Sequence, residues 1–160
     1  MKNLKMTVFD LENTLNQRLA SMQGMKYNDA SYIHLAVSAI KEEFAAQGIE
    51  NLHVSNWGIC AFAEIPQIPC DCKTDDIARI RYELKKDKRI VNGPGKGVIL
   101  SVSVAFREDL LPLSLEEAVR HVLNERKDDL LNNIREIRAK AVKTIEKCDT
   151  DIAILSNFSF

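Results

Sequence analysis

The sequence predicts an α+β protein with two N-terminal helices, a small antiparallel sheet and a long C-terminal helix. Apolar residues recur at steps of three and four near both ends of the chain, and they alternate with polar residues over positions 98–106. Glycines and prolines separate the segments between these regions. With 160 residues, of which 46% are hydrophobic, the chain can close one core. We therefore expect a single domain over residues 1–160, with residues 1–24 and 114–148 as flanking helices.

The two N-terminal helices are predicted from their apolar stripes. The first is expected to end near Gly24, and its stripe consists of Leu4, Val8, Leu11, Leu15, Leu19 and Met22. Asn28 and Asp29 offer a cap for the second helix. We expect this helix to end at Gly48, because glycine readily takes the left-handed conformation that is common at helix C-termini.

The middle of the chain contains one clear strand. Residues 98–106 alternate apolar side chains with Ser101 and Ser103, as in a half-buried strand. Residues 51–65 show no clean repeat of either kind. Pro66 and Pro69 predict a loop over residues 66–76, since proline lacks the backbone donor that a helix interior or a central strand needs.

Residues 75–88 fit two structures. As a helix, they place Ile77, Ile80 and Leu84 on one face, with an uncertain helix over residues 56–64 before it. As a strand, they alternate Ile80, Tyr82 and Leu84 with charged residues and form one arm of a hairpin closed by residues 87–97. The strand version gives an antiparallel meander of residues 52–65, 77–86 and 98–106, covered on one face by the flanking helices. Both versions stay open.

The C-terminal helix is predicted to begin at a capping box formed by Ser114 and Glu117. Its apolar pattern continues to Lys147 with an eleven-residue period, which disfavours a left-handed zipper. A helix of this length exceeds the width of a small domain, so it either breaks within residues 127–133 or projects. Its apolar stripe predicts a homodimer. Residues 149–160 are expected to dock as a last strand or to bind a protein partner.

Positive charge gathers in one segment, although the net charge is −1. Residues 73–98 contain eight Lys or Arg residues and four acidic ones. Such a local excess of positive charge is typical of a nucleic-acid contact, and a solvated charged face is the alternative.

In the helical version, the stretch IRYELKKDKRIVNGPGKGVIL is similar to the end of a recognition helix followed by a strand, a glycine-rich wing and a second strand. Residues 29–105 then resemble a winged helix-turn-helix domain. The resemblance implies a DNA-binding winged-helix core. It implies that one group of basic residues lies on or near the helix in the groove, namely Arg79, Arg81, Lys85 and Lys86. It implies that a second group reaches phosphates, namely Lys88, Arg89 and Lys96.

These observations predict a non-catalytic nucleic-acid-binding protein. One alternative is a protein-interaction or assembly protein, and another is a metal-dependent nuclease that uses Asp71 or Asp76 with Glu83 and Lys85. We expect no cofactor and no metal, because Cys70 and Cys72 lack the usual C-x2-C spacing of zinc ligands. No apolar run approaches the ~20 residues of a membrane span. We therefore expect a cytoplasmic protein.

Overall fold

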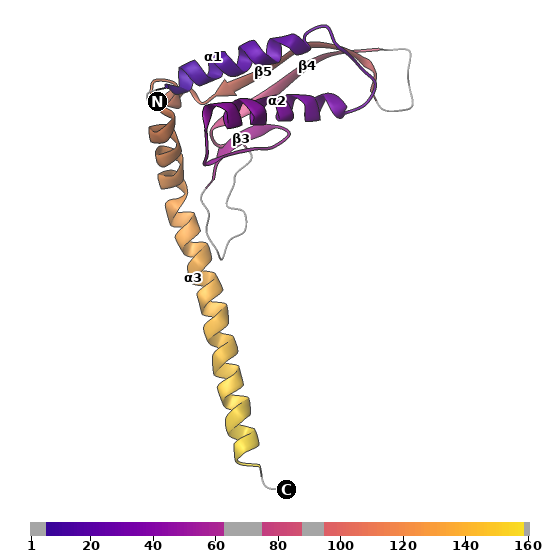
Figure 1. The fold of residues 1–160 in the computed structure, drawn as a ribbon. Coiled ribbons are helices and arrows are strands. Elements are labelled where there is room, and N and C mark those ends of the chain that lie inside the picture. Colours follow the sequence, from indigo (N-terminus) through magenta and orange to yellow (C-terminus); the bar gives the residue numbers. More distant parts are fainter. Residues whose placement is uncertain (1–5, 63–74, 88–94, 159–160) are drawn as a thin grey trace.

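The computed structural model describes residues 6–62, 75–87 and 95–158, and it confirms the α+β class (Figure 1). The helices are α1 (Val8–Leu19), α2 (Ser31–Gln47) and α3 (Leu115–Ser156), and two 3-10 turns, η1 (Ala20–Met22) and η2 (Glu108–Leu110), lie between them. The strands are β1 (Lys26–Tyr27), β2 (Leu52–Val54), β3 (Gly58–Ala61), β4 (Ala78–Lys86) and β5 (Gly97–Phe106).

The five strands form one antiparallel sheet in the order β1-β5-β4-β3-β2. The strand version is therefore confirmed for residues 75–87, and the helical versions of residues 75–87 and 56–62 are wrong. Residues 63, 64 and 88 lie outside the described residues, and the predicted strand over residues 52–65 is two short strands, β2 and β3. The physical reason is long-range pairing, because β4 pairs with β5 from Ala78↔Phe106 to Lys86↔Gly97. This pairing runs from one end of β4 to the other, with a register shift between Glu83 and Leu84, and the strand buries Ile80 while Arg79 and Arg81 stay exposed.

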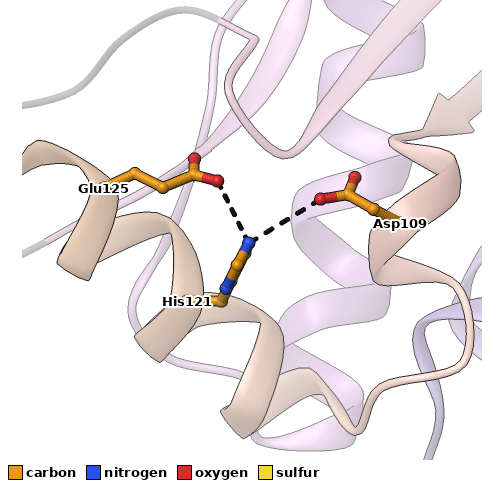
Figure 2. A group of neighbouring side chains, drawn as sticks. All are labelled: Asp109, His121 and Glu125. Carbon is orange, nitrogen blue, oxygen red and sulfur yellow. Dashed lines mark ion pairs between the residues drawn. The ribbon is translucent and has the colours of Figure 1, made fainter.

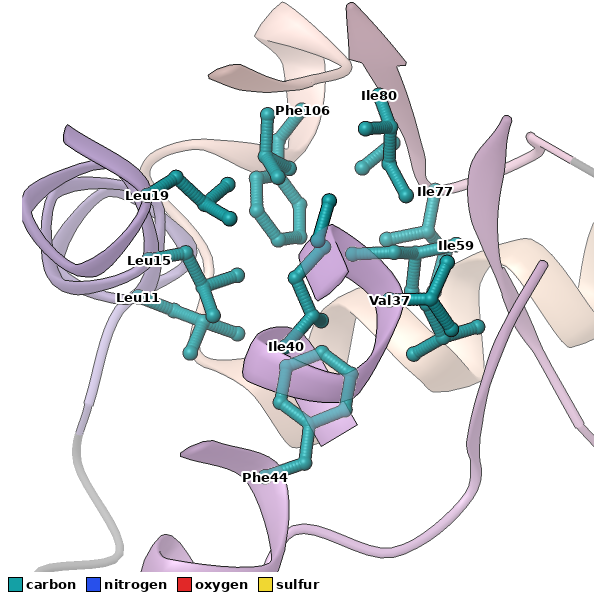
Figure 3. Packing of buried hydrophobic residues seen from close by; sticks show 14 of the residues in the cluster. Leu11, Leu15, Leu19, Val37, Ile40, Phe44, Ile59, Ile77, Ile80 and Phe106 are labelled. Atoms are coloured by element: carbon teal, nitrogen blue, oxygen red, sulfur yellow. The ribbon is translucent and has the colours of Figure 1, made fainter. Parts of the chain in front are cut away.

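The hydrophobic core lies between the sheet and the two N-terminal helices, which cover the same face of the sheet (Figures 1 and 3). Figure 3 shows how the side chains meet: Leu11, Leu15 and Leu19 from α1, Val37, Ile40 and Phe44 from α2, and Ile59, Ile77, Ile80 and Phe106 from the sheet side. Asn16 and Glu12 add polar contacts to this layer. The Asn16 amide donates to the Val104 carbonyl and accepts from its N–H at 2.7 Å, while Glu12 accepts the Phe106 N–H at 3.0 Å.

The predicted helix ends are largely confirmed. Gly48 ends α2 in the left-handed region with φ 66°. The Asp29 carboxylate accepts the Ser31 N–H at 2.8 Å, although Ala30 occupies the N-cap position. The first helix begins at Val8 after a Thr7–Asp10 capping box and ends at Leu19, followed by η1, so the predicted extent of residues 1–24 is too long at both ends. Leu4, the first member of its predicted stripe, lies outside the described residues.

Helix α3 begins at the predicted capping box of Ser114 and Glu117 and continues without a break for 42 residues, about 63 Å. It contains no glycine or proline, so nothing in its sequence interrupts the backbone hydrogen bonds. Of the two predicted alternatives, a break within residues 127–133 or a projecting helix, the structure shows the projecting helix. The prediction that residues 149–160 dock as a strand is also wrong, since residues 149–156 continue the helix away from the sheet (Figure 1).

Candidate functional site

A cleft of about 1150 Å³ lies at the end of the β4–β5 hairpin, at the opposite end of the sheet from the root of α3 (Figure 1). Its lining residues include four lysines, namely Lys26, Lys85, Lys86 and Lys96, and a single acidic residue, Asp87. Within residues 6–62, 75–87 and 95–158, none of the four lysines forms an ion pair. The cleft is therefore strongly basic in a protein that is almost neutral overall.

Strand pairing explains why these lysines come together. On β5, Val98 pairs with Lys26 on one side and with Lys85 on the other, so three adjacent strands place the two lysines in one row. With strands ~4.8 Å apart, the backbones of these two lysines are about 10 Å apart. The Asp87 N–H donates to the Lys96 carbonyl at 2.7 Å and extends the pairing toward the hairpin end.

Glycine is required at position 97 because the Lys85 backbone and the Tyr27 hydroxyl both lie very close to its Cα. A Cβ at this position would lie 2.0 Å from the Lys85 carbonyl oxygen and 2.9 Å from the Tyr27 hydroxyl. A real Cβ never approaches backbone this closely, so a larger residue would push β1 or β4 away. The absence of a Cβ at Gly97 thus allows β4 and the Tyr27 side chain to lie this close to it.

Tyr27 carries an unusual polar group beside the cleft. Its side chain is only 8% exposed, and its hydroxyl finds no hydrogen-bond partner among the described residues. A buried hydroxyl without a partner costs free energy of roughly 1–3 kcal/mol. Tyr27 lines the cleft beside Gly97, but its hydroxyl oxygen is itself buried, so a ligand in the cleft does not reach this O–H in the present conformation. The four lysines alone favour a phosphate-like ligand.

An aromatic row extends from the cleft across the helix-covered face of the sheet. The ring centroids of Tyr27 and Tyr32 are 5.1 Å apart, those of Tyr32 and Tyr82 are 5.5 Å apart, and those of Tyr82 and Trp57 are 5.6 Å apart. Burial raises the pKa of Tyr82 to about 12, and its hydroxyl donates to the Asn56 carbonyl at 2.8 Å. Within this row, the contact with Tyr32 holds the Tyr27 ring in place.

The residues predicted to bind nucleic acid fall into three groups. Lys85, Lys86 and Lys96 line the cleft. Arg79 and Arg81 lie on exposed positions of β4 nearer its start, where Arg79 pairs with Asp75 at 3.0 Å. The remaining two, Lys88 and Arg89, lie outside the described residues. Lys26 was not predicted, because a strand of two residues gives no periodic signal in the sequence.

A second cluster joins η2 to the root of α3 and consists of Asp109, His121 and Glu125 (Figure 2). The His121 Nε2 atom lies 3.0 Å from Glu125 and 3.7 Å from Asp109. Such a group has the ligand types of a metal site. However, Arg107 bonds to both carboxylates at 2.7–2.9 Å, and these bonds lower the pKa of Glu125 and of Asp109. The guanidinium already neutralises one of the two negative charges and bridges both carboxylates, so we interpret the cluster as a brace for α3.

A buried ion pair fixes the same helix to the sheet. Arg126 is 4% exposed, and its Nε lies 3.1 Å from the Asp76 carboxylate. Its guanidinium also donates to the Ala61 carbonyl at 2.7 Å, while the Ala61 N–H donates to Asp76 at 3.0 Å. These contacts occupy both carboxylate oxygens of Asp76, which weakens the nuclease alternative. The other acid named for that alternative, Asp71, lies outside the described residues, as do Cys70 and Cys72.

Comparison of the chain with family models, curated proteins and solved structures finds no match. The resemblance to winged helix-turn-helix domains therefore stays a prediction, and the segment that it assigned to the recognition helix is β4. Among the described residues, no helix has both the length and the apolar character needed to cross a membrane.

Proposed function

We propose that the protein binds nucleic acid without catalysing a reaction on it, and that the phosphate backbone enters the basic cleft at the end of the β4–β5 hairpin. One observation carries this proposal. The cleft gathers four lysines that are free of carboxylate partners in the described chain.

Lysine ammonium groups are strongly hydrated point charges that recognise phosphate without fixing its geometry. The four cleft lysines therefore favour binding with little dependence on base sequence. Each phosphate that they neutralise releases condensed counterions, so the logarithm of the association constant falls with the logarithm of salt concentration by ~0.9 per contact on duplex DNA. The salt dependence is thus a direct measure of how many lysines act.

The test is a fluorescence anisotropy titration with duplex and single-stranded oligonucleotides at several salt concentrations between about 50 and 200 mM. We expect the double variant Lys85→Gln, Lys86→Gln to bind more weakly and to lose roughly two units of salt slope on duplex. The matched control is Lys41→Gln, Lys127→Gln, which removes the same charge from exposed positions of α2 and α3. Absence of binding at the lowest salt, or equal slopes for both double variants, would refute the proposal.

A further inference from the structure

The projecting part of α3 carries an apolar stripe that its own domain does not cover. Burial along α3 ends with Arg126, and beyond residue 130 the helix stands away from the sheet (Figure 1). The stripe members Ile145 and Ile152 are each 60% exposed, and Leu155 is 70% exposed. The complete stripe consists of Ile134, Ile137, Ala141, Ile145, Cys148, Ile152 and Leu155.

The spacing of the stripe suits a straight pairing of two helices. Its positions repeat after eleven residues, as from Ile134 to Ile145 and from Ile137 to Cys148. Eleven residues make almost three full turns, so the stripe stays nearly parallel to the helix axis. Ala141 and Cys148 near its centre are small, which lets a second helix approach closely.

The charges beside the stripe distinguish the two directions of pairing. Arg138 and Asp149 are eleven residues apart and lie in line on one flank, while Lys140 and Asp151 lie in line on the other flank. Each flank therefore carries a cation toward the domain and an anion toward the tip.

In an antiparallel pair related by a two-fold axis, each flank meets the same flank of the other helix, so Arg138 faces Asp149 and Lys140 faces Asp151 of the second copy. In a parallel pair, opposite flanks meet. Arg138 would then lie near Lys140 and Asp149 near Asp151, which places like charges together. The charge pattern favours the antiparallel pair.

We infer that α3 binds α3 of a second copy of this chain in antiparallel orientation, with the two-fold axis between Thr144 and Ile145. With this register six of the seven stripe positions face another stripe position, and Ile145 lies beside the axis opposite Thr144. Ile134 lies opposite Leu155, Ile137 opposite Ile152, and Ala141 opposite Cys148 of the second copy. The overlap of residues 134–155 is about 33 Å long.

This arrangement does not depend on the proposed nucleic-acid binding, but it has a consequence for it. The two domains lie at opposite ends of the helix pair, with about 55 Å between the two Arg126 residues. The dimer therefore presents two basic clefts on one particle, and a long polyanion that reaches both gains avidity.

Cysteine cross-linking tests the orientation. In the antiparallel register, the two copies of Cys148 are seven residues apart along the axis, about 10 Å, which is too far for a disulfide. A chain with Ala141→Cys places that thiol opposite Cys148 of the second copy, so mild oxidation is expected to give a covalent dimer. Both chains carry Cys70→Ser and Cys72→Ser, whereas Cys60 is buried and stays. The chain with Ala141→Cys and Cys148→Ser is the control, and we expect it to remain uncross-linked.

Charge reversal tests the same register without cysteines. Arg138→Asp with Lys140→Asp places acids opposite acids, and we expect association measured by sedimentation to weaken by about tenfold or more. Adding Asp149→Lys and Asp151→Lys to that chain restores opposite charges and is expected to restore the dimer. A wild-type chain that remains monomeric at ~200 µM would overturn the pairing. A disulfide between two Cys148 residues, or failure of the fourfold variant to recover, would overturn the orientation.

Discussion

Replacement of Arg126 by methionine is expected to destabilise the protein strongly. Methionine keeps much of the side-chain length but removes the guanidinium that pairs with Asp76 at 3.1 Å and donates to Ala61 at 2.7 Å. The Asp76 carboxylate is only 11% exposed, so it would be left as a buried charge without its guanidinium partner, although the Ala61 N–H still donates to it. Breaking a buried pair in this way typically costs about 3–5 kcal/mol. We expect a loss of that size in the free energy of unfolding.

Urea unfolding followed by fluorescence measures this loss, because Trp57 is the only tryptophan of the chain. The matched control is Arg135→Met on the exposed part of α3, for which we expect a change within ~0.5 kcal/mol. The double variant with Asp76→Asn removes the uncompensated charge as well, so it should recover part of the loss. A loss below ~1 kcal/mol for the single variant would show that the buried pair does not hold α3 to the sheet.

Three further predictions concern the brace and the cleft. Arg107 lowers the pKa of Glu125, so this carboxylate stabilises the protein above its unfolded pKa, and the contribution is lost as the pH falls through the lowered value. Glu125→Gln should therefore lower the free energy of unfolding by less than ~1 kcal/mol near neutral pH, since the Arg107–Glu125 pair is partly exposed. In strong acid, urea unfolding of this variant should not differ from that of the wild type. Gly97→Ala should lower the free energy of unfolding by ~1–3 kcal/mol, because the new Cβ would lie 2.0 Å from the Lys85 carbonyl oxygen. Gly95→Ala should leave this free energy nearly unchanged, because its Cβ would lie 3.9 Å from the nearest atom, on the Tyr27 ring. Tyr27→Phe removes a buried hydroxyl that has no partner in the described chain, so the free energy of unfolding should hold or rise slightly, while nucleic-acid binding measured by anisotropy should stay unchanged.

The sequence predicts those elements whose signals are local. The Ser114–Glu117 capping box, the Gly48 stop and the alternation of β5 each depend on residues within a few positions of one another, and all three appear in the structure. Residues 75–88 matched both a helical and a strand period, and pairing with β5, whose partners lie up to about thirty residues away, decided between them. The pattern of residues within one segment does not show which distant strand that segment will pair with.

The candidate site was harder to predict for the same reason. Lys85, Lys86 and Lys96 are predicted from the charge of their segment and from the winged-helix resemblance, but their gathering with Lys26 depends on β1 pairing with the outer edge of β5. Arg79 looked equivalent to them in the sequence, yet an ion pair with Asp75 satisfies it at another part of β4. The density of positive charge along the sequence therefore identifies a basic segment. The order of the strands in the sheet then determines which of its charged side chains lie on the same surface.

The length of α3 connects the fold to the proposed pairing. The buried residues of this helix lie within residues 118–126, and beyond Arg126 only Leu130 and Ile134 are partly buried among its described residues. Isolated helices are marginal in water, because most helical stability in proteins comes from packing of an apolar face. The seven-position stripe over residues 134–155 is exposed at every position except Ile134, which is partly buried. A second helix that covers the stripe would supply the missing packing, and the arrangement of charge on its flanks selects a copy that runs in the opposite direction.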